Sequence, residues 1–177
     1  MKRWTLLLFL ILLSGLSIWY VSKGYHPSPK EGTLSPSFSL NDLSGRTYSL
    51  ANYRGKVLLI NFWATWCNPC VSEMASLDKL YQKLKDKNFE LLAISVDEGG
   101  WDEIKKFLQK HPVTFPILLD SDYKVADQYG TYRVPESYLI DSQGKIIDKI
   151  LGAQEWDSPE MLSKIEKALS EIPSKNP

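Results

Sequence analysis

The chain has 177 residues, a formal net charge of +0 and a hydrophobic content of 44%. This balance fits one ordinary globular domain together with an additional apolar segment. No basic excess points to a nucleic acid as partner, and no acidic tail predicts disorder. The sequence contains two cysteines, Cys67 and Cys70, and two histidines, His26 and His111.

The apolar segment lies at the N-terminus. Lys2 and Arg3 precede an uncharged stretch over residues 4–21. As a helix this stretch is about 27 Å long, close to the roughly 30 Å of a bilayer's hydrocarbon core. Aromatic residues stand at both of its ends, where interfacial aromatics are common. We therefore expect residues 1–21 to form a membrane anchor, with the N-terminus in the cytoplasm.

A cleaved signal peptide is the alternative interpretation of the same segment. Such peptides end in an Ala-x-Ala-like site, and residues 22–24 are a poor substitute for one. The absence of a cysteine after the apolar run also excludes lipid modification there. We therefore expect a single-pass anchor in the cell (inner) membrane and a domain that faces the periplasm or the cell exterior. In either case the domain enters an oxidising compartment.

The exported part begins with a segment rich in proline, glycine and small polar residues. Residues 22–37 are predicted to be an extended linker, with His26 as a solvated residue within it. Residues 38–172 are enough for a single core, and residues 173–177 form a tail. At the start of this domain, residues 38–40 and 48–50 alternate apolar and polar side chains around a turn, which predicts a short hairpin.

A buried strand and an amphipathic helix follow. Residues 56–63 are apolar and β-branched enough to form a central strand that is buried on both faces. Apolar residues then recur at helical spacing as far as Lys85, which predicts a helix from Cys67 to about Lys85. Pro69 falls in the first turn of this helix, where its missing N–H costs nothing.

The rest of the chain continues to alternate strands and helices. We expect strands over 89–96, 117–119, 136–140 and 145–151, and helices over 101–110, 124–129 and 159–171. The last two strands flank a four-residue turn and form a hairpin. This order predicts an α/β fold, in which a mixed central sheet has helices on both faces. The active site is expected at the carboxyl end of the central strand.

Cys67 and Cys70 form a Cys-x-x-Cys motif where the central strand ends and the helix begins. Cys67 falls near the N-cap, where backbone N–H groups and the helix dipole favour a thiolate. Cys70 lies about one turn further along the helix, more buried and close enough to form a small ring. We predict that Cys67 is the attacking thiol and that Cys70 resolves the mixed disulfide.

Two other uses of this motif are less favoured. A structural disulfide across so short a loop would add little stability. A zinc site needs about four ligands, which two cysteines and two distant histidines do not easily supply. No metal is therefore expected.

The stretch Asn-Phe-Trp-Ala-Thr-Trp-Cys-Asn-Pro-Cys over residues 61–70 resembles the active-site stretch of the thioredoxin superfamily. Within that superfamily it is most similar to the membrane-anchored TlpA/ResA-like thiol-disulfide oxidoreductases of the cytochrome c maturation type. The resemblance covers residues 36–172, including an N-terminal hairpin extension and an insert around residues 101–119. It implies a thioredoxin-like fold and a redox-active disulfide with no further cofactor.

The resemblance also implies roles for residues outside the motif. It places a cis proline at Pro135 and a partner groove at Trp66, Val134, Pro135 and Glu136, with the Val134 backbone pairing with an extended partner. Glu136 matches a Pro-Glu of the cytochrome-maturation members, and either lines the groove or is simply an exposed strand residue. Glu73 corresponds to a buried acid that exchanges protons with the cysteines. The alternative for Glu73 is a solvated glutamate.

One position departs from ordinary thioredoxins. These proteins carry a buried aspartate where this chain has Asn61. Because asparagine cannot take up a proton, Glu73 is the better candidate for proton transfer to and from Cys70.

The resemblance implies an enzyme, an anchored thiol-disulfide oxidoreductase that reduces disulfides in exported proteins such as apocytochrome c. Its electrons would come from a membrane thiol donor, and the protein would act as a monomer. A thiol peroxidase is one alternative, although Ala64 and its neighbours lack the Pro-x-x-x-Thr-x-x-Cys pocket of peroxiredoxins. A copper-delivery module is another, although copper-delivering relatives tend to use Cys-x-x-x-Cys with a distal histidine.

Overall fold

The computed structural model describes residues 14–15 and 28–173. Most of the expected anchor (1–21), His26 and nearly all of the expected tail (173–177) lie outside these residues. Within the described residues, no helix has both the length and the apolar character needed to cross a bilayer.

A five-stranded mixed sheet forms the centre of the domain, in the order β5-β4-β3-β6-β7. Its strands are β3 (Val57–Trp63), β4 (Phe89–Ser95), β5 (Ile117–Leu119), β6 (Glu136–Ile140) and β7 (Ile146–Leu151). Strand β3 runs parallel to β4 and antiparallel to β6. All seven residues of β3 are buried, which explains why the sequence there is continuously apolar rather than alternating.

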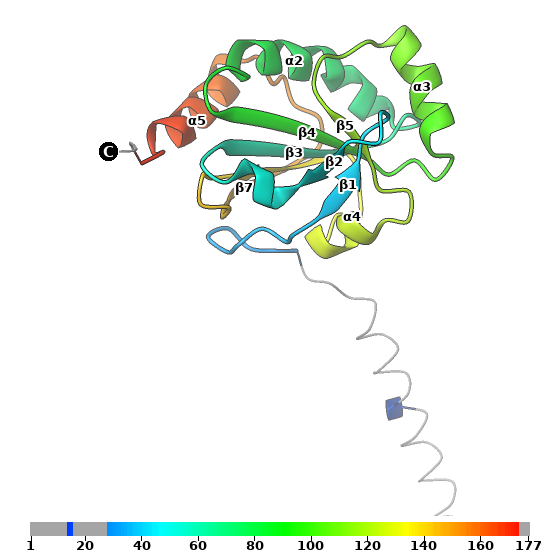
Figure 1. Cartoon of the computed structure of the whole chain (residues 1–177), viewed down its shortest axis with the longest axis horizontal. Coiled ribbons are helices and arrows are strands. Elements are labelled where there is room, and N and C mark those ends of the chain that lie inside the picture. The colour runs from blue at the N-terminus through cyan, green and yellow to red at the C-terminus, as the bar shows by residue number, and fades with distance from the viewer. Residues whose placement is uncertain (1–13, 16–27, 174–177) are drawn as a thin grey trace, which may run out of the picture.

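Helices pack on both faces of this sheet, as expected. They are α2 (Asn68–Leu84), α3 (Trp101–Lys110), α4 (Lys124–Tyr129) and α5 (Pro159–Ser170). In Figure 1, α2 and α5 lie above the sheet and α4 lies below it. The fold is therefore a thioredoxin-like α/β fold, and the carboxyl end of β3 leads directly into α2.

The N-terminal hairpin is present as β1 (Ser39–Asn41) and β2 (Thr47–Ser49), which pair antiparallel. The prediction placed Leu50 in the second strand, whereas Leu50 begins a 3-10 helix, η1 (Leu50–Tyr53). A capping box explains the change: the Ser49 hydroxyl accepts from the Ala51 N–H, and the Asn52 side chain accepts from the Ser49 N–H.

The described part of the expected linker is folded against the domain rather than extended away from it. Gly32 N–H donates to Ile146 O over 2.8 Å, and Ile146 N–H donates to Thr33 O over 2.9 Å. The Ser35 hydroxyl also meets the Tyr129 hydroxyl at 2.6 Å. Residues 28–37 therefore pack beside β7 and satisfy part of the sheet's edge. The composition of this segment predicts a tether because backbone hydrogen bonds to a distant strand leave no trace in the types of side chain.

Candidate active site

Cys67 and Cys70 are joined by a disulfide at the start of α2, with their Cα atoms 5.3 Å apart. Cys67 is the N-cap residue, as predicted, and its Sγ accepts the backbone N–H of Cys70 at 3.2 Å. Cys70 is fully buried, whereas Cys67 retains 6% exposure. The more exposed cysteine, Cys67, is thus the one whose thiolate the N-terminus of α2 would stabilise.

The loop between β3 and α2 is held by Asp97, which follows β4 and is fully buried. Its carboxylate accepts the Thr65 N–H at 3.0 Å, the Thr65 hydroxyl at 2.7 Å and the Ser95 hydroxyl at 2.6 Å. Trp66, next in the chain, is 62% exposed beside the disulfide. Sequence reasoning missed Asp97. An aspartate at the carboxyl end of the strand neighbouring β3 was the available signal.

The Val134–Pro135 peptide bond is cis, which confirms the prediction for this position. The carbonyl oxygen of Val134 lies 3.5 Å from Cys67 Sγ. Pro135 O accepts the Gly152 N–H at 3.0 Å, so the loop is also tied to the residue after β7. The segment before β6 therefore lies directly against the outer sulfur.

Two grooves flank this loop. The first, which we call the α4 groove, has a volume of about 480 Å³ and is lined by Trp66, Val134 and residues of α4. The second, the β7 groove, has a volume of about 590 Å³ and is lined by Pro135, Glu136 and Lys149, among others. The four residues predicted for the partner groove thus line two depressions rather than one: Trp66 lines the α4 groove, Pro135 and Glu136 line the β7 groove, and Val134 lines both.

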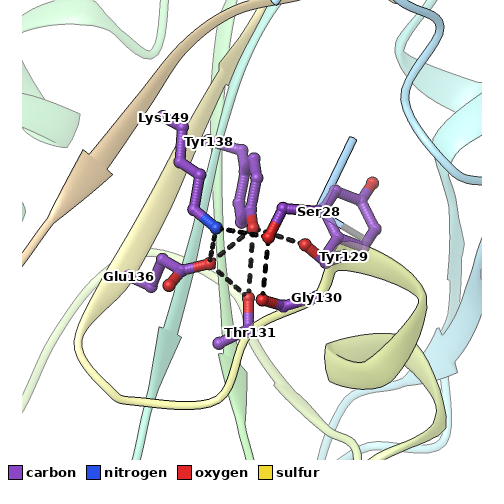
Figure 2. Close-up of polar contacts among 7 residues, drawn as sticks. All are labelled: Ser28, Tyr129, Gly130, Thr131, Glu136, Tyr138 and Lys149. Atoms are coloured by element: carbon purple, nitrogen blue, oxygen red, sulfur yellow. Dashed lines mark hydrogen bonds and ion pairs between the residues drawn. The ribbon is translucent and has the colours of Figure 1, made fainter. Parts of the chain in front are cut away.

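Glu136 is not the exposed strand residue that was one of the two expectations, because only 5% of it is accessible. Its Oε1 accepts Lys149 Nζ at 2.8 Å, the Thr131 hydroxyl at 2.8 Å and the Tyr138 hydroxyl. Lys149 also donates to the Ser28 hydroxyl at 2.8 Å. Figure 2 shows how these side chains converge. Burial, and then the hydrogen bond to Glu136, raises the pKa of Tyr138.

Glu73 is also buried, with 2% exposure, so the alternative of a solvated glutamate is wrong. Its Oε1 accepts Asn61 Nδ2 at 2.9 Å, and its Oε2 accepts the Gln154 N–H at 2.9 Å and Trp156 Nε1 at 2.8 Å. Burial raises the pKa of Glu73, and the three hydrogen bonds oppose that rise. This glutamate lies one helical turn after Cys70.

Across the described residues, no group of three or more histidine, cysteine, aspartate or glutamate side chains is arranged to hold a metal ion. That the dithiol works without a further cofactor stays a prediction.

Comparison with known proteins gives consistent matches. The model of the AhpC/TSA family matches residues 32–149. Thiol-disulfide oxidoreductase ResA of Bacillus cereus is 35% identical over 162 residues, which cover 89% of this chain and 93% of the relative. ResA of Bacillus subtilis is 33% identical over 150 residues, which cover 85% and 83%.

Solved structures agree. A candidate thiol:disulfide interchange protein DsbE from Chlorobium tepidum has a TM-score of 0.75 and 30% identity, over 80% of this chain and 99% of that one. A thiol:disulfide interchange protein from Bacteroides sp. has a TM-score of 0.67 and 29% identity, over 85% and 95%.

Proposed function

Because the chain belongs to the AhpC/TSA family and is a thiol-disulfide oxidoreductase of the thioredoxin-like fold, we propose that it reduces disulfides in exported proteins. The observation that carries this proposal is the Cys67–Cys70 disulfide at the start of α2, beside the cis Val134–Pro135 bond. A dithiol in this position can take up and release a pair of electrons without a further group.

In the first step, the Cys67 thiolate of the reduced protein attacks one sulfur of a partner disulfide. A new S–S bond joins Cys67 to the partner, and the partner's second sulfur leaves as a thiolate that takes up a proton. The backbone N–H of Cys70 and the N-terminal end of α2 support this role, because both favour the thiolate form of Cys67.

In the second step, the Cys70 thiol passes its proton to Glu73, and the resulting thiolate attacks the Cys67 sulfur. The Cys67–Cys70 bond forms and the bond to the partner breaks, so that the partner's first sulfur leaves as a thiolate, which takes up a proton. Two electrons have then moved from the protein to the partner. Burial of Glu73 supports its role, because a raised pKa makes its carboxylate a stronger base than an exposed one. The product is the oxidised form described above.

The partner binds as an extended segment along the Val134 backbone, with side chains reaching the α4 and β7 grooves. We propose apocytochrome c with an oxidised Cys-x-x-Cys-His as one substrate, on the strength of the resemblance to cytochrome c maturation proteins. The exposed indole of Trp66 and the partly buried Glu136–Lys149 pair offer one apolar and one polar contact to such a segment.

The proposed setting is the outer side of the cell (inner) membrane. Residues 1–21 act as a single-pass anchor, and a membrane thiol protein returns electrons to the oxidised disulfide. Support for the anchor comes from the sequence alone, through its length, its flanking charges and its terminal aromatics.

Trapping of a mixed disulfide tests this function. The full-length Cys70→Ser variant, reduced and then mixed with a peptide that carries an oxidised Cys-x-x-Cys-His, should form a covalent adduct that dithiothreitol releases. Cys67→Ser is the matched control and should form none. Adducts of equal yield with Cys67→Ser, or none with Cys70→Ser, would contradict the mechanism.

A further inference from the structure

The polar pocket around Glu73 has an unusual balance of donors and acceptors. The two carboxyl oxygens accept three N–H groups, from Asn61, Gln154 and Trp156. These donors come from β3 and from the segment between β7 and α5. No acceptor faces either oxygen among the described residues. The hydrogen bonds therefore favour the carboxylate anion, against the opposite effect of burial, and they offer no acceptor for the proton of the neutral acid.

A proton on Oε2 would meet the Gln154 N–H and the Trp156 Nε1–H, which are both fixed donors. The backbone amide cannot turn, and an indole nitrogen is only a donor. Oε1 faces a single donor, the side-chain amide of Asn61. That amide can reverse, because rotation by half a turn exchanges its oxygen and nitrogen. Only Oε1 can therefore gain an acceptor without movement of the backbone.

The other end of the Asn61 amide supports this reading. Asn61 is fully buried, and its Oδ1 has no hydrogen-bond partner among the described residues. A buried polar atom left in this way is rare and requires an explanation. Nδ2 also donates to the Ser137 hydroxyl at 2.9 Å. Since a hydroxyl can either accept or donate, Ser137 can pair with whichever end of the amide faces it.

We propose that Asn61 is a positioning residue for the Glu73 proton, and that its side-chain amide turns over each time Glu73 changes between carboxylate and acid. In the carboxylate form, Nδ2 donates to Glu73 and Ser137, as observed. In the acid form, Oδ1 accepts the proton on Glu73 Oε1 and the hydroxyl proton of Ser137. Either orientation leaves one end of the amide without a partner, so the charge of Glu73 decides between them.

This inference deepens the proposed function and rests on it in one point, that the proton on Glu73 comes from Cys70. No charged side chain other than Glu73 takes part in the pocket's hydrogen bonds among the described residues. On α2, Cys70 lies one turn earlier, while β6 contributes the uncharged Ser137. When Glu73 takes up the Cys70 proton, the neutral acid would thus be stabilised by the turned amide of Asn61 rather than by a neighbouring charge.

Infrared difference spectroscopy tests the rotation directly. The full-length protein in detergent micelles, with ¹³C in its asparagine side chains, is titrated through the protonation of Glu73. Subtraction of the spectra of Asn61→Leu isolates the Asn61 carbonyl, with Asn61→Ser in its place if Asn61→Leu does not fold. We expect this band to move to lower frequency as the Glu73 carboxylic-acid band appears, because Oδ1 then gains hydrogen bonds. An unmoved Asn61 band would overturn the proposal.

The pKa of Glu73 in the same variant gives a second readout, measured by ¹³C NMR. If the Asn61 amide stabilised only the carboxylate form of Glu73, its removal would destabilise that form alone and would raise the pKa of Glu73 by about one pH unit or more. An amide that turns serves both forms, so we expect a shift below about half a pH unit. Ser137→Ala, which keeps the amide, is the control. Neither measurement requires turnover, so failure here is distinct from failure of the trapping experiment.

Discussion

Two buried glutamates lie near the disulfide, and their surroundings differ in one respect. Glu136 forms an ion pair with Lys149 at 2.8 Å, whereas Glu73 accepts N–H groups only and is paired with no cation in the part of the chain that the structure describes. A paired cation compensates for the burial of a carboxylate, while burial without a cation favours the neutral form of the acid. The Glu136 cluster thus forms part of the wall of the β7 groove with its charge paired, whereas the Glu73 pocket fits the proton exchange that we propose for it.

The largest effect is expected when Lys149, the cation of the Glu136 cluster, is removed. Lys149→Met leaves Glu136 buried without its partner, and should lower the free energy of unfolding by about 3 kcal/mol in urea denaturation. The double variant with Glu136→Gln should recover most of that loss, because no charge remains buried. A loss below about 1 kcal/mol for Lys149→Met would mean that the pair behaves like a surface ion pair.

A kinetic difference between the two glutamates should come next in size. Glu73→Gln removes the proton acceptor and should slow the decay of a preformed mixed disulfide on Cys67 by about 100-fold, measured by quenched flow. Glu136→Gln should instead raise the KM for a protein disulfide, because Glu136 lines the β7 groove. The reverse pattern would show that the roles of the two residues have been exchanged.

The smallest effect concerns pH and stability. The folded-state pKa of Glu73 is raised above its ordinary value of 4.5, so the native state binds its proton more tightly than the unfolded chain does. The stability that this gives is complete below pH 4.5 and is lost as the pH rises through the folded-state pKa. The free energy of unfolding of the unaltered protein should therefore fall relative to that of Glu73→Gln as the pH rises from 4.5 through the folded-state pKa of Glu73. A difference between the two free energies of unfolding that does not change with pH would contradict the raised pKa of Glu73.

The sequence predicts most elements because their signals are local. The central strand, the helix that starts at Cys67 and the hairpin around residues 141–144 follow from apolar periodicity, Pro69 and turn residues. The N-cap geometry of Cys67 could be expected for the same reason. The cis bond before Pro135 came from the resemblance, since nothing local distinguishes a cis proline from a trans one.

The features that escaped prediction depend on distant partners. Glu136 could not be assigned to a buried or exposed position, because its burial depends on Lys149 from the neighbouring strand β7. Asp97 directly follows a predicted strand, but its hydrogen bond to the Thr65 N–H arises only in the folded chain. The orphaned oxygen of Asn61 is likewise a property of the assembled pocket, and no pattern in the sequence encodes it.

Ser28 lies in the segment before the predicted domain, forms part of the wall of the β7 groove and accepts a hydrogen bond from Lys149. Recombinant versions that start at residue 38, the boundary that composition suggests, would thus delete part of the wall of the β7 groove and the backbone hydrogen bonds that residues 32–35 form with residues 144–146. Truncations intended to free the catalytic domain for solution work should keep Ser28, or partner affinities will be measured on an altered surface.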